Sequence, residues 1–321
     1  MTIFNMKKLI GFIGQGWIGK NYADDFENRG YSVVRYTRDP KYIANKDRLK
    51  ECDIVFVAVP TPTRNEKFDD SVVRSVMKLV GKGKTAVIKS TILPGTTISI
   101  QKENPNIYVF HSPEFLTEAT AAFNAAHPDR NIVGVPYGTE KEKRLAKEVL
   151  SVLPEAPYET VCSSYEAEFV KYGGNCWFYT KVIFVNLLYD LTKKMGCDWD
   201  IIKKAMAADP RIGSTHLNAI HSTTDERLKS LRFGDYHLDP IHKSGRGAGG
   251  HCFIKDFAAF SEMYEKEIGD ERGMKVLQSL RDKNIELLLG SNKDLDLLQE
   301  VYGKSVLKKK KTPVSRKKAK K

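Results

Sequence analysis

The stretch Leu9-Ile10-Gly11-Phe12-Ile13-Gly14-Gln15-Gly16-Trp17-Ile18-Gly19 decides the fold. Its first five residues form a continuous apolar run, which predicts a strand covered on both faces. A Gly-x-Gly-x-x-Gly turn follows and opens a helical pattern that ends at Gly30. Between a strand and a helix, such a turn lets a pyrophosphate approach the helix N-terminus. We therefore predict a dinucleotide-binding turn, made by Gly14, Gln15, Gly16, Trp17, Ile18 and Gly19.

The end of the next strand, Tyr31 to Tyr36, bears on which dinucleotide binds. An acidic residue there would bind both ribose hydroxyls, but that place falls on Thr37, with Arg38 next. Thr37 and Arg38 could accept a 2′-phosphate, and Asp39 could substitute for the acid if the strand ends late. We predict NAD as the cofactor and leave NADP open.

Further apolar runs alternate with helical patterns, which predicts an α/β fold with a Rossmann-like, doubly wound parallel sheet. Ligands bind beyond the carboxyl ends of such strands, and polar turns fall there: Pro60 and Thr61 after one strand, Thr91 after another. The run from Ser112 to Glu118 follows a third. The expected strands are 53–59, 86–89, 107–110, 131–135 and 158–161, with a helix at 139–150.

A helical pattern without proline runs from Ser163 to Met195 and opens with a capping box, Ser163 to Glu166. A helix of about 50 Å generally spans a domain junction or a dimer interface, so we expect a homodimer through it. Shorter helices should follow at 199–207, 256–266, 273–289 and 294–302. We predict a Rossmann-like domain at 1–162, an all-helical domain on the long helix at 163–307, and a disordered basic tail at 308–321.

A second glycine-rich stretch, Gly245 to Gly250, leads to His251 and Cys252. A thiol near a helix start feels the positive end of the dipole, which favours thiolate. Lys255 adds a cation, and Asp256 can share a helix face with the thiol. This pattern indicates a covalent nucleophile beside a carboxylate; the structural alternative is a buried, inert cysteine, with Asp256 as a helix N-terminal acid.

Composition narrows the class of protein. The net charge is +12, but the tail after residue 307 holds nine Lys and Arg and no acid, so the body is nearly balanced. The tail should make only weak, salt-dependent contacts with nucleic acid. Five cysteines without metal-like spacing suggest a reducing compartment, hence a cytoplasmic protein without a metal site. No apolar run is long enough to span a membrane.

The ordered motifs resemble the UDP-glucose/GDP-mannose dehydrogenase family over roughly residues 7 to 290. They are Gly14 to Gly19, Val57 to Pro62, Ser90 to Thr97, Ser112 to Glu118 continuing to Arg130, Glu166 to Asn175, Asp209 to Gly213 and Gly249 to Asp256.

The resemblance implies a nucleotide-sugar 6-dehydrogenase, which oxidises a UDP-hexose, UDP-glucose first among the candidates, in two NAD-dependent steps through a thiohemiacetal and a thioester on Cys252. It assigns catalytic positions to Cys252, Asp256, Lys171, Asn175, Thr91, Glu118 and Glu114. It assigns cofactor contacts to the glycine turn, Thr37, Arg38, Pro60, Thr61, Thr91 and Glu118. It assigns substrate contacts to Glu114, Phe115, Leu116, Lys171, Asn175, Arg211, Gly249 and Lys255.

Three departures from the family pattern matter. The family's third, nucleotide-sugar-binding domain would follow residue 288, yet about thirty residues remain. The segment from Asn218 to Lys243 is longer than usual and contains His221, His237 and His242, which fits a solvated loop better than a metal site. Ala248, His251 and Ile254 replace residues that are usually aromatic, Ser and Pro. A competing interpretation is a truncated member that binds dinucleotide as a regulatory protein without completing catalysis.

Overall fold

The fold is taken from a computed structural model that describes residues 7–117, 120–221 and 244–311. By its internal contacts the chain divides into two compact units. The first comprises residues 1–62 and 68–173, and the second residues 63–67 and 174–321. The division falls inside the long helix; the domain limits at residues 162 and 307 stay predictions from the sequence.

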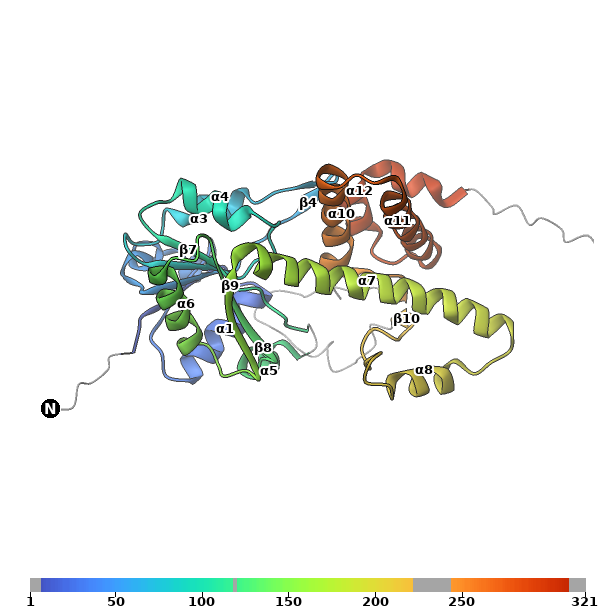
Figure 1. The fold of residues 1–321 in the computed structure, drawn as a ribbon, viewed down its shortest axis with the longest axis horizontal. Helices are drawn as coiled ribbons and strands as arrows, with labels where there is room; N and C mark the ends of the chain where they lie inside the picture. Colours follow the sequence, from blue (N-terminus) through green and yellow to red (C-terminus); the bar gives the residue numbers. More distant parts are fainter. Residues whose placement is uncertain (1–6, 118–119, 222–243, 312–321) are drawn as a thin grey trace, which may run out of the picture. The chain divides into compact units, whose positions relative to one another are not determined.

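The first unit is built on a seven-stranded sheet with the order β2-β1-β3-β6-β7-β8-β9. All strands expected from the sequence are present, so the Rossmann-like prediction is confirmed (Figure 1). Their bounds are β1 Ile10–Ile13, β2 Val33–Tyr36, β3 Ile54–Val57, β6 Thr85–Ile88, β7 Tyr108–His111, β8 Arg130–Val135 and β9 Tyr158–Ser163.

The sheet is parallel except at one junction. β7 pairs with β8 antiparallel, and β8 pairs with β9 parallel, so the last two strands run against the other five. Among the described residues that connect β7 to β8, the α-helix is α5, Ala121–Ala126, with six residues and a rise of about 9 Å. So short a helix does not carry the chain back to the edge of the sheet where β7 begins. β8 therefore starts at the edge where β7 ends and runs antiparallel to it.

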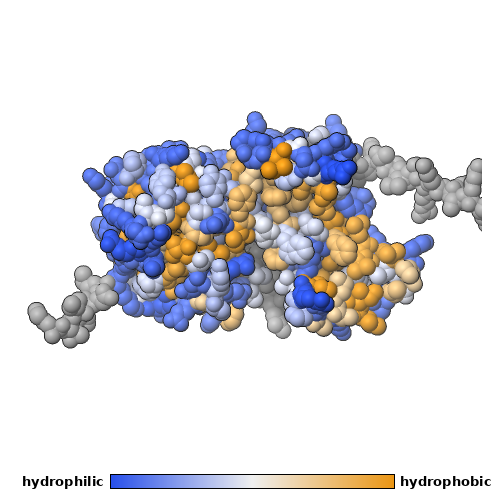
Figure 2. Space-filling model, in the orientation of Figure 1, coloured by the Kyte–Doolittle hydropathy of each residue, from blue (hydrophilic) through white to orange (hydrophobic). Residues whose placement is uncertain are grey.

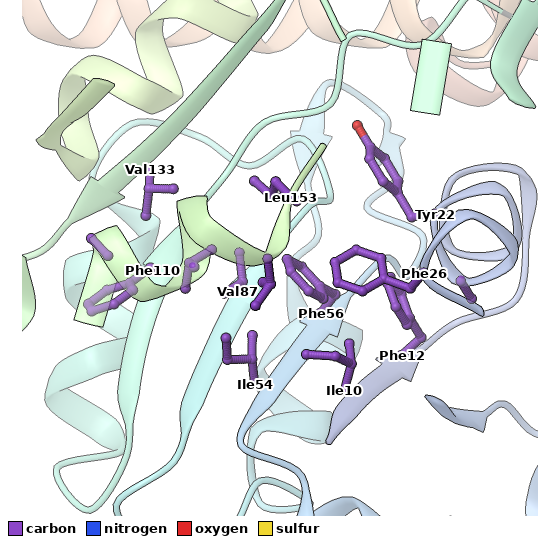
Figure 3. Close-up of a cluster of buried hydrophobic side chains, with 14 of the residues drawn as sticks. Ile10, Phe12, Tyr22, Phe26, Ile54, Phe56, Val87, Phe110, Val133 and Leu153 are labelled. Atoms are coloured by element: carbon purple, nitrogen blue, oxygen red, sulfur yellow. The ribbon is translucent and has the colours of Figure 1, made fainter. Parts of the chain in front are cut away.

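Helices cover both faces of the sheet. One face packs against α1 (Trp17–Asn28), α5 and α6 (Glu140–Val152), and the other against α3 (Ser71–Met77) and α4 (Thr96–Glu103). Figure 3 shows the core of the first face, in which Phe12, Phe26 and Phe56 lie together. Their ring centroids are 5.1 to 5.4 Å apart. This core fixes the β1–α1 junction, where the glycine turn lies. Two short elements complete the unit, α2 Pro40–Ile43 and η1 Lys46–Glu51. The hairpin of β4 Thr63–Arg64 with β5 Lys67–Phe68 belongs, except for Phe68, to the second unit.

The second unit is helical, as predicted. It contains α7 (Ser164–Lys194) from residue 174 onward, α8 Trp199–Ala207, α10 Gly250–Glu267, α11 Glu271–Ser291, α12 Leu295–Tyr302 and the 3-10 helix η3 Lys304–Lys311. A small ribbon pairs β10 (Ile220–His221) with β11 (Gly245–Arg246). At the start of α7, which belongs to the first unit, the predicted capping box is present: the N–H of Ser163 donates to Glu166, and the N–H of Glu166 donates to Ser163 Oγ.

Two boundaries differ most from the sequence-based expectation. Helix α10 begins at Gly250 and not at Asp256, so Cys252 lies in its first turn. Residues 308–311, expected at the start of the tail, belong to η3, and residues 312–321 lie outside the described part. Within the described ranges, no helix has the length and apolar character needed to cross a bilayer.

Candidate functional site

The glycine turn between β1 and α1 has room for a phosphate. Gly14 adopts φ +92°, and a Cβ there would lie 2.1 Å from the carbonyl oxygen of Ala58. A Cβ on Gly19 would lie 2.0 Å from the carbonyl oxygen of Gly14, so the helix packs directly on the turn. At Gly16 a Cβ would meet nothing within 4 Å, and this residue precedes α1 without a side-chain cap. Open space in front of uncapped N–H groups suits the pyrophosphate of a dinucleotide.

The residues at and after the end of β2 have defined contacts, one of them with the glycine turn. The strand ends at Tyr36, so Thr37 and the exposed Arg38 follow directly. Asp39 caps α2 by accepting from the N–H of Lys41 over 2.8 Å. Arg35, for which the sequence predicts no role, is buried and donates to Gln15 over 3.2 Å. The turn is thereby tied to β2.

Two further polar turns at the carboxyl edge of the sheet are joined to each other. Thr61 Oγ1 donates to the carbonyl oxygen of Thr91 over 2.7 Å, and both residues are buried. Ser90 Oγ also bonds with the N–H and carbonyl of Val59, over 2.9 and 2.7 Å. Hydrogen bonds therefore link the turn after β3 to the turn after β6, next to the glycine turn.

Glu114 and Lys171 form a buried ion pair. Lys171 Nζ lies 2.7 Å from Glu114 Oε1 and also donates to the Glu114 carbonyl over 2.8 Å. Their side chains are 7% and 8% exposed. Phe115 lies between cations, with its ring centroid 5.8 Å from Lys171 Nζ and 3.8 Å from Arg130 Cζ. Leu116 donates its N–H to Glu114 Oε2 over 2.8 Å. The structure thus brings together four of the predicted positions.

Glu168 anchors the start of α7 to the loop that follows Thr91. Its carboxylate accepts from the N–H of Gly95 over 2.6 Å, and from the N–H and Oγ1 of Thr97 over 2.9 and 2.6 Å. Burial nevertheless raises the pKa of Glu168. Lys171 lies one helical turn after Glu168 on α7. The hydrogen bonds of Glu168 therefore also fix the position of the Lys171 side chain.

A buried lysine near this edge escaped sequence reasoning. Lys89, the residue after β6, is 3% exposed, donates to Ser112 Oγ over 3.0 Å and lies 4.6 Å from the Tyr22 ring centroid. Burial lowers its pKa to about 7, and the charge of Glu114 opposes that shift. Its neighbour His111 is fully buried, and burial lowers its pKa to about 3. An isolated Lys at the end of an apolar strand carries no sequence signal that distinguishes it from a surface lysine.

The second unit holds the other predicted catalytic residues. Asp256 is 1% exposed and accepts from Asn175 Nδ2 over 2.6 Å and from Lys255 Nζ over 2.5 Å. Burial, with the charge of Asp256, raises the pKa of Cys176. The reading of Asp256 as only a helix N-terminal acid is too narrow, because its carboxylate bonds to another helix.

Cys252 is the third residue of α10 and is exposed. All five cysteines lie in described segments, and none is in a disulfide. Four side chains from the second half of α11 and the residues after it hold the glycine loop that leads to Cys252. Asn284 bonds to both backbone groups of Ala248, and Ser291 Oγ accepts from the Arg246 N–H. Lys293 and Asp294 bond to Gly247 and Gly250.

Arg211 lies apart from these contacts. Its side chain is 88% exposed and pairs with Asp209 over 2.7 Å. The following loop is held by Lys181, whose Nζ donates to the carbonyl oxygens of Ile212 and Gly213.

Several predicted features fall outside the described residues. They include Glu118, residues 222–243 with His237 and His242, and the tail beyond residue 311. In the segments that are described, no three His, Cys, Asp or Glu side chains gather as a metal site would require.

A glycine turn packed on a doubly wound sheet, with an open helix N-terminus, defines a dinucleotide-binding protein. Residues 41–153 match the NAD binding domain of the UDP-glucose/GDP-mannose dehydrogenase family, and residues 165–225 match its central domain. The two ranges together cover more than half of the chain. The chain belongs to this family, and its dinucleotide cofactor is NAD(H).

Curated relatives agree with this family, and solved structures share the fold. The chain is 29% identical to the UDP-glucose 6-dehydrogenase of Rickettsia prowazekii over 279 residues, which is 80% of this chain and 58% of that protein. The structure of a UDP-glucose dehydrogenase from Pyrobaculum islandicum aligns with a TM-score of 0.70 and 24% identity, over 94% of this chain and 73% of that one.

A 3-hydroxyisobutyrate dehydrogenase from Mycobacterium tuberculosis aligns with a TM-score of 0.63 and 15% identity, over 96% of this chain and all of that one. Both structural likenesses show the fold alone. The chain spans about half the length of the curated relatives it matches.

Proposed function

We propose that the protein is a nucleotide-sugar 6-dehydrogenase that converts a UDP-hexose, with UDP-glucose as the first candidate, to the uronate. The observation that carries this proposal is the buried Asp256, which lies on the same helix as Cys252 and is bonded to Lys255 of that helix and to Asn175 of α7. A thiol, a carboxylate, an amide and an ammonium group are the parts that acyl chemistry on a covalent intermediate needs.

When bound, NAD accepts hydride from the sugar carbon in each of two oxidations. In the proposed sequence the 6-hydroxyl group first loses its proton and C6 loses a hydride, which gives the aldehyde. The Cys252 thiolate adds to the aldehyde carbon, and loss of a second hydride from the thiohemiacetal gives a thioester. Water then cleaves the C–S bond, which releases the carboxylate and returns the thiol. Capture by sulfur keeps the aldehyde from escaping.

The buried groups have separate roles in this proposal. Lys171 and Asn175 would stabilise the oxyanion that forms on sulfur addition, one by charge and one by hydrogen bond. Asp256 orients the Asn175 amide and accepts from Lys255, so it fixes the direction of both donors. Glu114, held by Lys171, and Thr91, held by Thr61, are proposed to handle protons at the sheet edge. Glu118 is proposed to position the hydrolytic water.

The remaining contacts are proposed from the family positions. The cofactor would rest on Gly14 to Gly19, Thr37, Arg38, Pro60, Thr61 and Thr91, and the sugar nucleotide on Phe115, Leu116, Arg211, Gly249 and Lys255. The test is turnover of purified protein with UDP-glucose, UDP-N-acetylmannosamine and GDP-mannose, each with NAD and with NADP. Reduced nicotinamide and sugar acid are measured separately.

Cys252→Ala should abolish acid formation. Cys197→Ala is the matched control, because Cys197 is also exposed and lies in the same unit. Acid formation at the wild-type rate in Cys252→Ala would refute the covalent role. Saturable NAD binding without turnover of any of the three sugars would favour the regulatory alternative.

We further propose that the protein is a homodimer that pairs through α7. Trp177, Phe184 and Leu191 lie seven residues apart on this helix and are 62%, 58% and 58% exposed. Such a spacing forms the seam of paired helices. Figure 2 shows apolar side chains over the C-terminal half of α7. Phe184→Glu should halve the mass measured by light scattering, whereas Val276→Glu, exposed on α11, should not. A monomeric wild-type protein would refute the dimer. The cytoplasmic location stays a prediction.

A further inference from the structure

Helix α10, which presents Cys252, has no N-cap side chain in its own sequence. The N-cap residue is Gly249, and no side-chain hydrogen bond from it closes the helix. Asp294, which follows α11, supplies this bond from a distance: its Oδ2 accepts from the Gly250 N–H over 2.8 Å. The carboxylate therefore satisfies one of the N–H groups that a helix leaves open in its first turn.

Lys293 holds the same loop on the other side of Gly249. Its Nζ donates to the Gly247 carbonyl over 2.9 Å. A Cβ on Gly249 would lie 2.0 Å from Asp294 Oδ2 and 2.8 Å from Lys293 Cε. Both charged side chains thus pack directly on the backbone that leads to Cys252, with no room for a side chain between them.

Both residues are buried, Lys293 at 2% and Asp294 at 3% exposure. Burial lowers the pKa of Lys293, and the charge of Asp294 opposes that shift. Burying a charge is costly unless it is compensated, and a neutral amide is sufficient to hold this loop, since Asn284 binds both backbone groups of Ala248. At the neighbouring positions the loop is held by the charged side chains of Lys293 and Asp294, where a neutral amide would be sufficient. We infer that their charges have an electrostatic role.

We propose that Asp294 and Lys293 are positioning residues that set the ionisation of the Cys252 thiol, a role that rests on the proposed function of Cys252 as the nucleophile. The carboxylate of Asp294 binds the N–H of Gly250, which lies two residues before Cys252 at the N-terminus of α10. It offsets the positive end of the helix dipole. It therefore raises the pH at which the thiolate forms. The ammonium group of Lys293 acts in the opposite sense.

Other titratable groups surround the start of α10 in this unit and contribute a background that the two residues modify. They are Lys255 and Asp256 on α10, Cys176 on α7, His216 beside Phe253, Arg281 on α11 and Tyr302 on α12. The test must therefore compare variants in which only one of the two charges changes.

The experiment measures the rate at which iodoacetamide alkylates Cys252 as a function of pH, with the Cys252 peptide quantified by mass spectrometry in the full chain. Asp294→Asn should lower the midpoint by about half a pH unit or more, the effect of one charge about a helical turn away. Lys293→Gln should raise it. The double variant should return close to the wild-type midpoint. Asp296→Asn, an exposed acid at the start of α12, should leave the midpoint unchanged.

Opposite shifts separate electrostatics from loosening of the loop, which would move both single variants in the same direction. Equal or absent shifts in the two single variants would overturn the proposal, and so would a shift in Asp296→Asn as large as that in Asp294→Asn. If one single variant fails to fold, the other and the double variant still give the sign. The measurement needs neither substrate nor turnover, so it stands apart from the Cys252→Ala test of the proposed function.

Discussion

Asn175 donates from Nδ2 to Oδ2 of Asp256 over 2.6 Å, and this bond joins α7 to α10 inside the helical unit. The second oxygen of the carboxylate is taken by Lys255. Both carboxylate oxygens of Asp256 accept hydrogen bonds, and the residue is 1% exposed. Asp256 is therefore a fixed acceptor that orients the Asn175 amide and the Lys255 ammonium group.

Asp256→Asn should therefore disturb chemistry more than folding. An amide keeps the volume but gives Asn175 and Lys255 one acceptor in place of two. We expect kcat to fall on the order of 100-fold to 1,000-fold, measured by steady-state turnover on whichever nucleotide sugar is accepted, while NAD affinity stays constant. Glu265→Gln, an exposed acid on the same helix, is the control. An Asp256→Asn enzyme with wild-type kcat would contradict the role.

The Lys171–Glu114 pair should respond as a buried ion pair. Removal of one partner leaves the other charge buried and uncompensated, so Lys171→Met should lower the free energy of unfolding by about 3 to 5 kcal/mol. Glu114→Gln should also destabilise. The double variant should lose less than the sum of the two single losses, as urea unfolding would show. Additive losses would mean that the pair contributes no coupling.

Lys89 should make stability depend on pH in the alkaline range. Its folded pKa of about 7 lies below its ordinary value of 10.5. Between these values the unfolded chain holds the proton and the folded chain does not, so stability rises with pH, by up to about 1.4 kcal/mol per pH unit. The stabilisation is absent below the folded pKa and complete above the unfolded one.

Lys89→Met should flatten this slope, because it removes the titrating group and keeps an unbranched side chain. Urea unfolding at several pH values from about 7 to about 10 checks it. Lys78→Met, exposed on the same unit, should keep the wild-type slope. A wild-type slope in Lys89→Met would assign the pH dependence to another group.

Two glycines of the turn should behave differently when replaced by alanine. A Cβ on Gly19 would lie 2.0 Å from a backbone oxygen, so Gly19→Ala should destabilise the fold by about 1 to 3 kcal/mol. A Cβ on Gly16 meets nothing within 4 Å, so Gly16→Ala should fold normally. Its methyl group would occupy the space proposed for the pyrophosphate, and NAD affinity should fall on the order of 10-fold. Calorimetric titration with NAD and urea unfolding separate the two effects. Unchanged NAD affinity in Gly16→Ala would place the cofactor elsewhere.

The sequence alone determined the order of the strands along the chain, the glycine turn, the long helix and the positions of the polar turns. Each of these is a local property. Continuous apolar runs specify buried strands, glycine spacing specifies a tight turn, and a long helical pattern without proline specifies a helix. Motif order was also sufficient to identify the family.

The tertiary structure decided what the pattern left open. It showed that β8 runs against β7, that α10 begins six residues before Asp256, and that Glu168 and Lys171 bind different buried partners. It also revealed Lys89 and Asp294, which look like ordinary surface residues in the sequence. Burial and long-range hydrogen bonds depend on which segments meet in space, and a local pattern does not contain that information.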